Sequence, residues 1–351
     1  MIHSYRPPLR LAAILLPVLL LIAVSGNAQG KFNQPGNILI TDQFNNRVIE
    51  IDPAGHIVWQ FGHGPGDIAA SAIVGTNDAE RVGNLTLMSG TGIPAGATKN
   101  CKAGCADNRV LLVDQTGNIV WQYGKFGVTG AGADQLNTPV QNTYLTLPDS
   151  EAHVLITDQG NNRIIEVRLS DKGIVWEYDG LNSPNAAELL ANGNVLISDE
   201  NNNQALEVTH AYGSASSVVH TYTQAGGVPF NTVAFASRLP NGHTLITDAG
   251  NSRIVETDEA GDVFWQFFTN TRAGSNPAPA PTRAVRLASG NTLISDQFND
   301  QVIAVNSDGD IVAAYGTINT PGFSPNSALS KMNAPYSAYV IGDYTGMTPP
   351  F

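Results

Sequence analysis

The chain has 351 residues and a formal net charge of −12 at pH 7, because 30 acidic residues outnumber 18 lysines and arginines. An acidic surface repels phosphate backbones and anionic lipid, so the composition argues against nucleic acid as a partner. Only 14% of the residues are charged, whereas glycine and proline number 35 and 20, which is typical of many short strands joined by turns.

The first 28 residues have the pattern of an export signal. Arg6 and Arg10 precede an apolar run at 11–24, and small residues follow up to Ala28, where we expect cleavage. The run is short for a membrane-spanning helix and contains Pro17. We therefore predict a periplasmic or extracellular protein with no stable membrane insertion after cleavage, and an uncleaved anchor is the alternative. Cleavage leaves 16 basic residues against 30 acidic ones.

After the signal, one phrase of sequence returns six times. The copies are 36–62, the split pair 84–90 and 108–124, 153–179, 193–208, 242–268 and 290–316. In the first copy, a continuous apolar run at 38–40 predicts a buried strand, and the runs at 48–51 and 57–61 predict two strands farther out. A short run upstream of most copies adds a fourth strand. Units of this size must pack against one another to bury their apolar faces.

Four-stranded units with a period of about 45 residues predict an all-β, six-bladed β-propeller. The first copy has no upstream strand, whereas the last is followed by a surplus strand-like segment at 333–346. We predict that this C-terminal segment pairs beside 38–42 in the first blade, which closes the ring and leaves no free sheet edge. Residues 29–351 then form a single domain.

Blade two carries an insert at 91–106 in place of a short loop. The insert holds both cysteines, Cys101 and Cys105, which can form a local disulfide in an oxidising compartment. A redox-active or metal role is the alternative, although there is no CxxC motif and no adjacent histidine. Long loops on a rigid scaffold are frequent recognition sites. A decorated loop without a ligand is the other interpretation.

The phrase at 36–52, with Asn45, Asn46 and Arg47 after the aspartate, resembles the NHL repeat. The resemblance covers nearly all of the chain after the signal and implies the six-bladed propeller. Related rings include protein-binding and RNA-binding modules, amidating lyases, lactonases and sulfotransferase-like enzymes, so it implies no single function. Departures from the pattern are Gln204 and Gln301 in place of arginine, and His220 and Ala313 in place of tryptophan.

One aspartate recurs in nearly every copy: Asp42, Asp158, Asp199, Asp248 and Asp296. Because the position repeats, we interpret these residues as stabilising the following turn rather than as a ring of metal ligands. The repeated tryptophans are likewise interpreted as packing between neighbouring outer strands.

Candidate site residues lie where the inner strands are expected to begin, around the central channel. The candidate ligand-binding residues are Asn77, Gln141, Asn142, Asn185, Glu188, Asn231, Arg283 and Tyr336. The resemblance to lactonase-like propellers implies calcium as a possible cofactor, with Asp78, Glu80 and Glu188 as candidate oxygen ligands. A solvated channel lining is the alternative. Asp78 and Glu80, two apart on one strand and therefore on one face, are the candidate catalytic acid and base.

These features predict an exported binding module that recognises a protein, peptide or glycan through the channel face and the insert. The alternative is a calcium-assisted hydrolase or lyase that acts at the channel, so enzymatic activity stays open at this point. A third class, a structural envelope protein, predicts neither a metal nor a soluble ligand.

Overall fold

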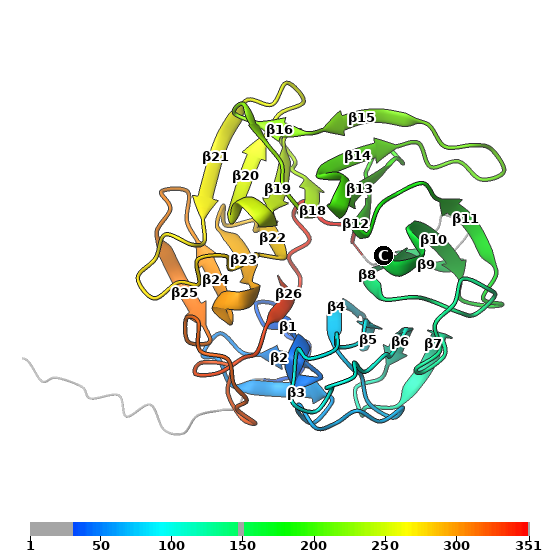
Figure 1. The fold of residues 1–351 in the computed structure, drawn as a ribbon, viewed down its shortest axis with the longest axis vertical. Coiled ribbons are helices and arrows are strands. Elements are labelled where there is room, and N and C mark those ends of the chain that lie inside the picture. Colours follow the sequence, from blue (N-terminus) through cyan, green and yellow to red (C-terminus); the bar gives the residue numbers. More distant parts are fainter. Residues whose placement is uncertain (1–30, 147–150, 350–351) are drawn as a thin grey trace, which may run out of the picture.

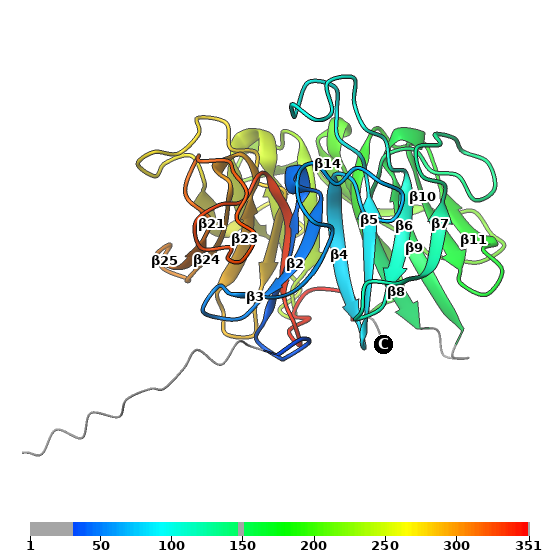
Figure 2. The ribbon, with the colours of Figure 1, turned by 90° about the horizontal axis from the view of Figure 1, so that it is seen from below.

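The computed structural model describes residues 31–146 and 151–349, which form six four-stranded antiparallel sheets arranged in a ring (Figure 1). Each sheet is one blade, and its first strand lies nearest the central axis (Figures 1 and 2). The predicted all-β, six-bladed propeller is therefore confirmed. The predicted export signal, residues 1–28, lies outside the described residues. Among the helices of the described ranges, none has the length and apolar character needed to cross a bilayer.

The strands of each blade are given from the axis outwards. Blade 1 has β26 (Pro335–Val340), β1 (Ile38–Asp42), β2 (Arg47–Ile51) and β3 (Ile57–Phe61). Blade 2 has β4 (Thr76–Val82), β5 (Leu85–Gly90), β6 (Arg109–Val113) and β7 (Ile119–Gly124). Blade 3 has β8 (Pro139–Thr146), β9 (Ala152–Asp158), β10 (Arg163–Arg168) and β11 (Ile174–Tyr178).

The second half of the ring repeats this order. Blade 4 has β12 (Pro184–Leu189), β13 (Val195–Asp199), β14 (Gln204–Val208) and β15 (Val218–Tyr222). Blade 5 has β18 (Val233–Arg238), β19 (Thr244–Asp248), β20 (Arg253–Thr257) and β21 (Val263–Phe268). Blade 6 has β22 (Arg283–Arg286), β23 (Thr292–Asp296), β24 (Gln301–Val305) and β25 (Ile311–Tyr315). A small hairpin, β16 (Gln224–Ala225) and β17 (Val228–Pro229), precedes blade 5.

Short 3-10 turns join the second and third strands of five blades. They are η1 (Gln43–Asn45), η2 (Gln159–Asn161), η3 (Glu200–Asn202), η4 (Ala249–Asn251) and η5 (Gln297–Asn299). The insert takes this place in blade 2, so it stands on the same face of the ring as the five turns.

The C-terminal strand closes the ring. β26 pairs antiparallel with β1, with Val340 opposite Ile38 and Ala338 opposite Ile40. Blade 1 is thus built from both ends of the propeller domain, as predicted, and β1 has no free inner edge.

Four of the five repeated aspartates fasten the inner strand of their own blade to the turn, and Asp296 instead accepts from Arg272 and Asn299. The Asp158 carboxylate accepts the backbone N–H of Asn137, just before β8, at 2.8 Å, and Nε of Arg163 on β10 at 2.8 Å. Asp42, Asp199 and Asp248 accept the equivalent backbone N–H groups. In blade 4, Gln204 takes the place of the arginine. These contacts agree with the structural interpretation of the aspartates.

A second repeated position joins five of the six blades to the next blade. The residue after each 3-10 turn has a positive φ, which asparagine tolerates well. Asn162 is one of these, and its side-chain oxygen accepts the backbone N–H of Ser183 in blade 4 at 2.9 Å. Four further junctions have the same bond: Asn46 with Gly75, Asn108 with Thr138, Asn203 with Thr232, and Asp300 with Ala334.

Ser252 stands at this position in blade 5, with φ of 56°. Among the described residues, no such bond joins its short side chain to Ala280, the residue of positive φ that precedes blade 6. The junction between blades 5 and 6 therefore lacks the contact found at the other five junctions.

Replacing Ser252 with Asn should supply this contact and a residue that favours the left-handed region. We expect Ser252→Asn to raise the free energy of unfolding by about 1 kcal/mol. Asn162→Ala, which removes the equivalent bond, should lower it by about 1–2 kcal/mol. Chemical denaturation measures both, and a Ser252→Asn protein no more stable than the parent contradicts this account of the junctions.

Candidate functional site

Irregular pairing at the start of the inner strands turns side chains toward the channel. The register of β4 with β5 shifts between Thr76 and Asp78, and the register of β12 with β13 shifts between Pro184 and Ala186. The extra residues are Asn77 and Asn185. Such bulges re-aim a side chain out of the alternation of a regular strand. Both asparagines line the cavity at the channel mouth.

A layer of uncharged polar groups covers the mouth of the channel. The Tyr336 hydroxyl, from blade 1, donates to Oδ1 of Asn185 in blade 4 at 2.8 Å. Nε2 of Gln43 donates to Asn77 Oδ1 at 2.7 Å, and Nε2 of Gln297 donates to Gln43 Oε1 at 2.8 Å. The cavity beneath has room for about one water molecule.

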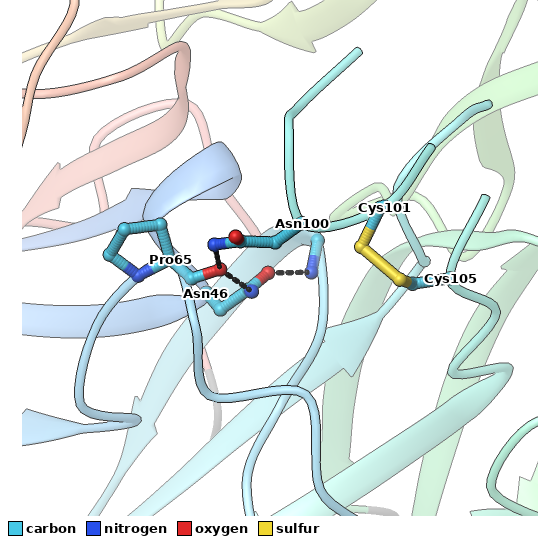
Figure 3. The surroundings of a disulfide bond; sticks show 6 residues. Asn46, Pro65, Asn100, Cys101 and Cys105 are labelled. Atoms are coloured by element: carbon cyan, nitrogen blue, oxygen red, sulfur yellow. Dashed lines mark hydrogen bonds between the residues drawn. A yellow bond between two sulfur atoms is a disulfide. The ribbon is translucent and has the colours of Figure 1, made fainter. Parts of the chain in front are cut away.

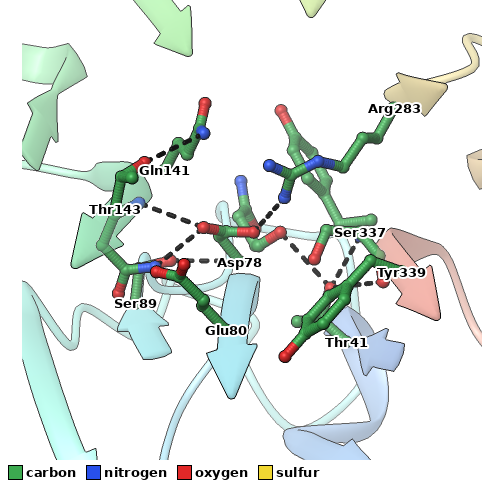
Figure 4. A network of polar contacts seen from close by, with 12 residues as sticks. Thr41, Asp78, Glu80, Ser89, Gln141, Thr143, Arg283, Ser337 and Tyr339 are labelled. Atoms are coloured by element: carbon green, nitrogen blue, oxygen red, sulfur yellow. Dashed lines mark hydrogen bonds and ion pairs between the residues drawn. The ribbon is translucent and has the colours of Figure 1, made fainter. Parts of the chain in front are cut away.

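Charged residues from three blades meet below this layer, and Figure 4 shows those of blades 2 and 6. Arg283 of blade 6 forms an ion pair with Asp78 of blade 2, and its second terminal nitrogen lies 3.5 Å from Glu188 of blade 4. Asn142 donates to Asp78 from its backbone at 3.1 Å and from its side chain at 2.8 Å. Gln141 donates to Glu188 at 2.5 Å. We call Asp78, Glu80, Gln141, Asn142, Glu188 and Arg283 the axial cluster.

Burial raises the pKa of two axial carboxyl groups, those of Glu80 and Glu188. Burial, together with the charges of Asp78 and Glu188, raises the pKa of Glu80 well above its ordinary value. Burial also raises the pKa of Glu188, against the opposing effect of Arg283. The raised pKa of Glu80 favours its neutral form, which limits the negative charge that one guanidinium has to balance.

The axial cluster does not fit a calcium ion. Both carboxylate oxygens of Asp78 already accept hydrogen bonds, one from Arg283 and the other from Asn142. The guanidinium thus occupies the position where a cation would be needed. Within the described ranges, no three histidine, cysteine, aspartate or glutamate side chains are grouped as a metal site.

Most of the residues singled out in the sequence come together. Asn77, Gln141, Asn142, Asn185, Glu188, Arg283 and Tyr336 all lie in or directly over the axial cluster, with Asp78 and Glu80. Asn231 is different: its side chain is exposed before β18, and its backbone N–H binds Asp248. Asp78 and Glu80 are buried, at 3% and 6% exposure, so neither faces solvent as a free acid or base.

The insert is held by the predicted disulfide between Cys101 and Cys105 (Figure 3). Cys101 is buried with Val74 and Ile93 in a small apolar cluster of its own. The side chain of Asn100 donates to the Pro65 carbonyl at 2.6 Å, which ties the insert to the loop after blade 1. Figure 2 shows the insert rising above the ring, away from the C-terminal end of the chain.

A cleft of about 520 Å³ lies between the insert and blade 3, beside the channel mouth. We call it the insert cleft. Its lining carries no charged side chain and is rich in amides, hydroxyls and small apolar residues: Gln43, Asn77, Thr91, Gly92, Ile93, Pro94, Ala95, Ala103, Gly104, Cys105, Ala106, Asn108, Thr129, Asn137, Thr138 and Gln159. Asn77 belongs to both the cleft and the channel mouth, so the two are continuous.

Glu200 is a residue of this face that the sequence analysis missed. It begins η3, at the position of Gln43, Gln159 and Gln297 in other blades. Nε2 of Gln159 donates to its carboxylate at 3.0 Å. Burial raises the pKa of Glu200 to about 7. In the sequence, this position is marked by Asp199-Glu200 in the copy at 193–208, where three other copies have Asp-Gln.

Comparisons of sequence with protein-family models and with curated proteins find no match. Solved structures share the fold. A protein of unknown function from Bacteroides caccae is 15% identical with a TM-score of 0.55, over 84% of this chain and 97% of that one. A chain of a nidogen/laminin complex is 12% identical with a TM-score of 0.51, over 79% and 92%. Virginiamycin B lyase from Staphylococcus aureus is 14% identical with a TM-score of 0.46, over 72% and 77%.

The likenesses to the Bacteroides caccae protein and to the nidogen/laminin chain show a shared fold and no particular activity. The resemblance to NHL repeats stays a prediction.

Glu200→Gln should change how stability depends on pH. A folded-state pKa of about 7, above the ordinary 4.5, means that the folded protein holds this proton more tightly than the unfolded chain. Its ionisation therefore costs stability as pH rises from about 5 to 8. We expect Glu200→Gln to exceed the parent in melting temperature by a few degrees at about pH 8 and by less at about pH 5.

Thermal unfolding at several pH values measures this difference. Glu259→Gln, at an exposed turn residue, is the matched control and should show no such trend. A Glu200→Gln effect that is the same at every pH contradicts the assignment.

Proposed function

We propose that this protein is an exported binding module that recognises a protein, peptide or glycan at the insert cleft. The observation that carries the proposal is a large cleft of uncharged polar groups, bounded by a disulfide-held insert and continuous with the channel mouth. Rigid walls lower the entropy lost on binding. A disulfide is also what an exported protein, kept in an oxidising compartment, is able to retain.

The channel itself supports the proposal less directly. Its polar residues bind one another across the axis, and Tyr336 covers them from the side of the insert. A ligand therefore reaches the mouth through the cleft, where Gln43 and Asn77 lie, rather than by entering the axis. No feature of the axial cluster favours the alternative, a metal-assisted hydrolase or lyase.

The lining favours an uncharged ligand. Amide side chains offer both donors and acceptors, as sugar hydroxyls and peptide groups do. The acidic surface of the chain, with a formal charge of −12, adds repulsion against anions. Proteins also bind on this kind of fold, as a propeller-like chain from a nidogen/laminin complex illustrates.

Filling the cleft should abolish recognition without unfolding the protein. Ala103 and Ala97 are both exposed in the insert, but only Ala103 lines the cleft. We expect Ala103→Arg to reduce binding at least about tenfold in a panel of neutral oligosaccharides and peptides, because the long cation occupies the site. The matched variant Ala97→Arg should bind as the parent does. Equal binding by the parent and both variants would place recognition elsewhere.

A further inference from the structure

The chain continues past β26 as a strap, residues 341–349, under the face of the ring opposite the insert (Figures 1 and 2). It first contacts blade 6, where the Asp343 carboxylate accepts the backbone N–H of Ala288 at 2.8 Å. It then passes blade 5, where a Cβ added at Gly346 would lie 3.3 Å from the Arg238 carbonyl. It ends against blade 4, at Glu188 and Leu189.

Thr348 satisfies the axial cluster from below. Its backbone N–H donates to Oε2 of Glu188 at 2.9 Å, and its hydroxyl lies 2.7 Å from the same oxygen. The hydroxyl also lies 3.0 Å from the carbonyl of Leu189. Thr348 is 7% exposed and Glu188 is 2% exposed, so this is a buried carboxylate that takes two of its partners from the strap. Hydrogen bonds to a buried charged group are among the stronger ones.

Met347 supplies the apolar half of the contact. It packs against Ala186, Phe235 and Val285, which come from the inner strands of blades 4, 5 and 6. An unbranched thioether side chain fills such a gap between strands without specific geometry. Sites that hold extended peptides use main-chain hydrogen bonds for affinity and side-chain pockets for specificity. The strap makes one contact of each kind, through the backbone N–H of Thr348 and the side chain of Met347.

Beyond Ile341, the strap is not part of the sheet that closes the ring. Pairing with blade 1 ends at Ile341, whose backbone N–H donates to the Asn37 carbonyl at 2.8 Å and whose carbonyl accepts the Gly36 N–H at 3.0 Å, so the strap leaves the sheet after this residue. A cleft of about 450 Å³ between blades 4 and 5 runs beside the strap, lined by Gly346, Met347 and Thr348 together with Leu190 and Pro240. The strap thus lies along one wall of a groove that has space for more chain.

We propose that this lower channel mouth is a peptide-binding site for an apolar residue followed by a residue with a hydroxyl, and that residues 344–348 occupy it in cis. A partner peptide of the same chemistry gains access by displacing the strap. The site lies on the opposite face from the insert cleft and does not depend on the function proposed there.

The test uses the full-length chain with Met347→Asp and Thr348→Val, which removes the apolar contact and the hydroxyl hydrogen bond and leaves only the backbone N–H of residue 348 on Glu188. We expect amide hydrogen exchange in 344–348 to rise at least about tenfold, because the anchored segment becomes free to open. The variant should then bind a synthetic peptide of residues 345–349, Thr-Gly-Met-Thr-Pro, in titration calorimetry, whereas the parent protein should not. The same peptide with valine at the position of Thr348 should bind about tenfold more weakly, because one hydrogen bond to a charged group is lost.

A chain that ends at Thr345 gives a second route to the same site and should also bind the peptide. The proposal is overturned if the full-length variant keeps parental exchange in 344–348. It is overturned equally if folded protein of either kind ignores the peptide, or if the parent binds the peptide as tightly as the variants do. Should the shortened chain fail to fold, the full-length variant alone decides.

Discussion

The main physical constraint on this structure is the burial of polar and charged side chains at the axis of the ring. Six inner strands converge there, and polar side chains that leave water at the axis must find partners in one another. Arg283 provides such a partner to two carboxylates, those of Asp78 and Glu188. Because these residues come from blades 6, 2 and 4, the cluster forms only when the ring is closed. The neutralised axis therefore depends on the closure that β26 provides.

A filled axis moves recognition to the two faces. On one face, the insert adds a wall beside the channel mouth and forms a cleft without charged side chains. On the other, the strap reaches the buried Glu188 from below with Thr348. The blades provide a rigid frame between them, held by the bonds that Asn162 and its counterparts make across the junctions. In this arrangement, recognition depends on the insert and the strap at the two faces, and the six blades serve as the scaffold.

The repeats predicted the ring, its closure and the convergence of most channel residues, since a period in the sequence tells which strand each residue belongs to. The period does not tell where a strand bulges. The exposed position of Asn231 and the hydrogen bond of Tyr336 across the axis could therefore not be predicted from it. The ion pair between Arg272 and Asp296 was also not predictable from the sequence. Arg272 lies on the loop after blade 5, whereas the arginine of other blades is replaced by Gln301 on β24 of blade 6. The contacts of the strap could not be predicted from the repeats, because the strap is not part of a repeat and binds residues that are distant in the sequence.

The neutralised axis is tested most directly by the free energy of unfolding of Arg283→Met. Removing the guanidinium leaves Asp78 buried with an uncompensated charge and takes a cationic partner from Glu188, so we expect a loss of about 3–5 kcal/mol. A protein that also carries Asp78→Asn and Glu188→Gln should recover much of that loss, because no charge is then left without a partner. If Arg283→Met alone unfolds at the same denaturant concentration as the parent, the guanidinium does not hold the axis and the account is wrong.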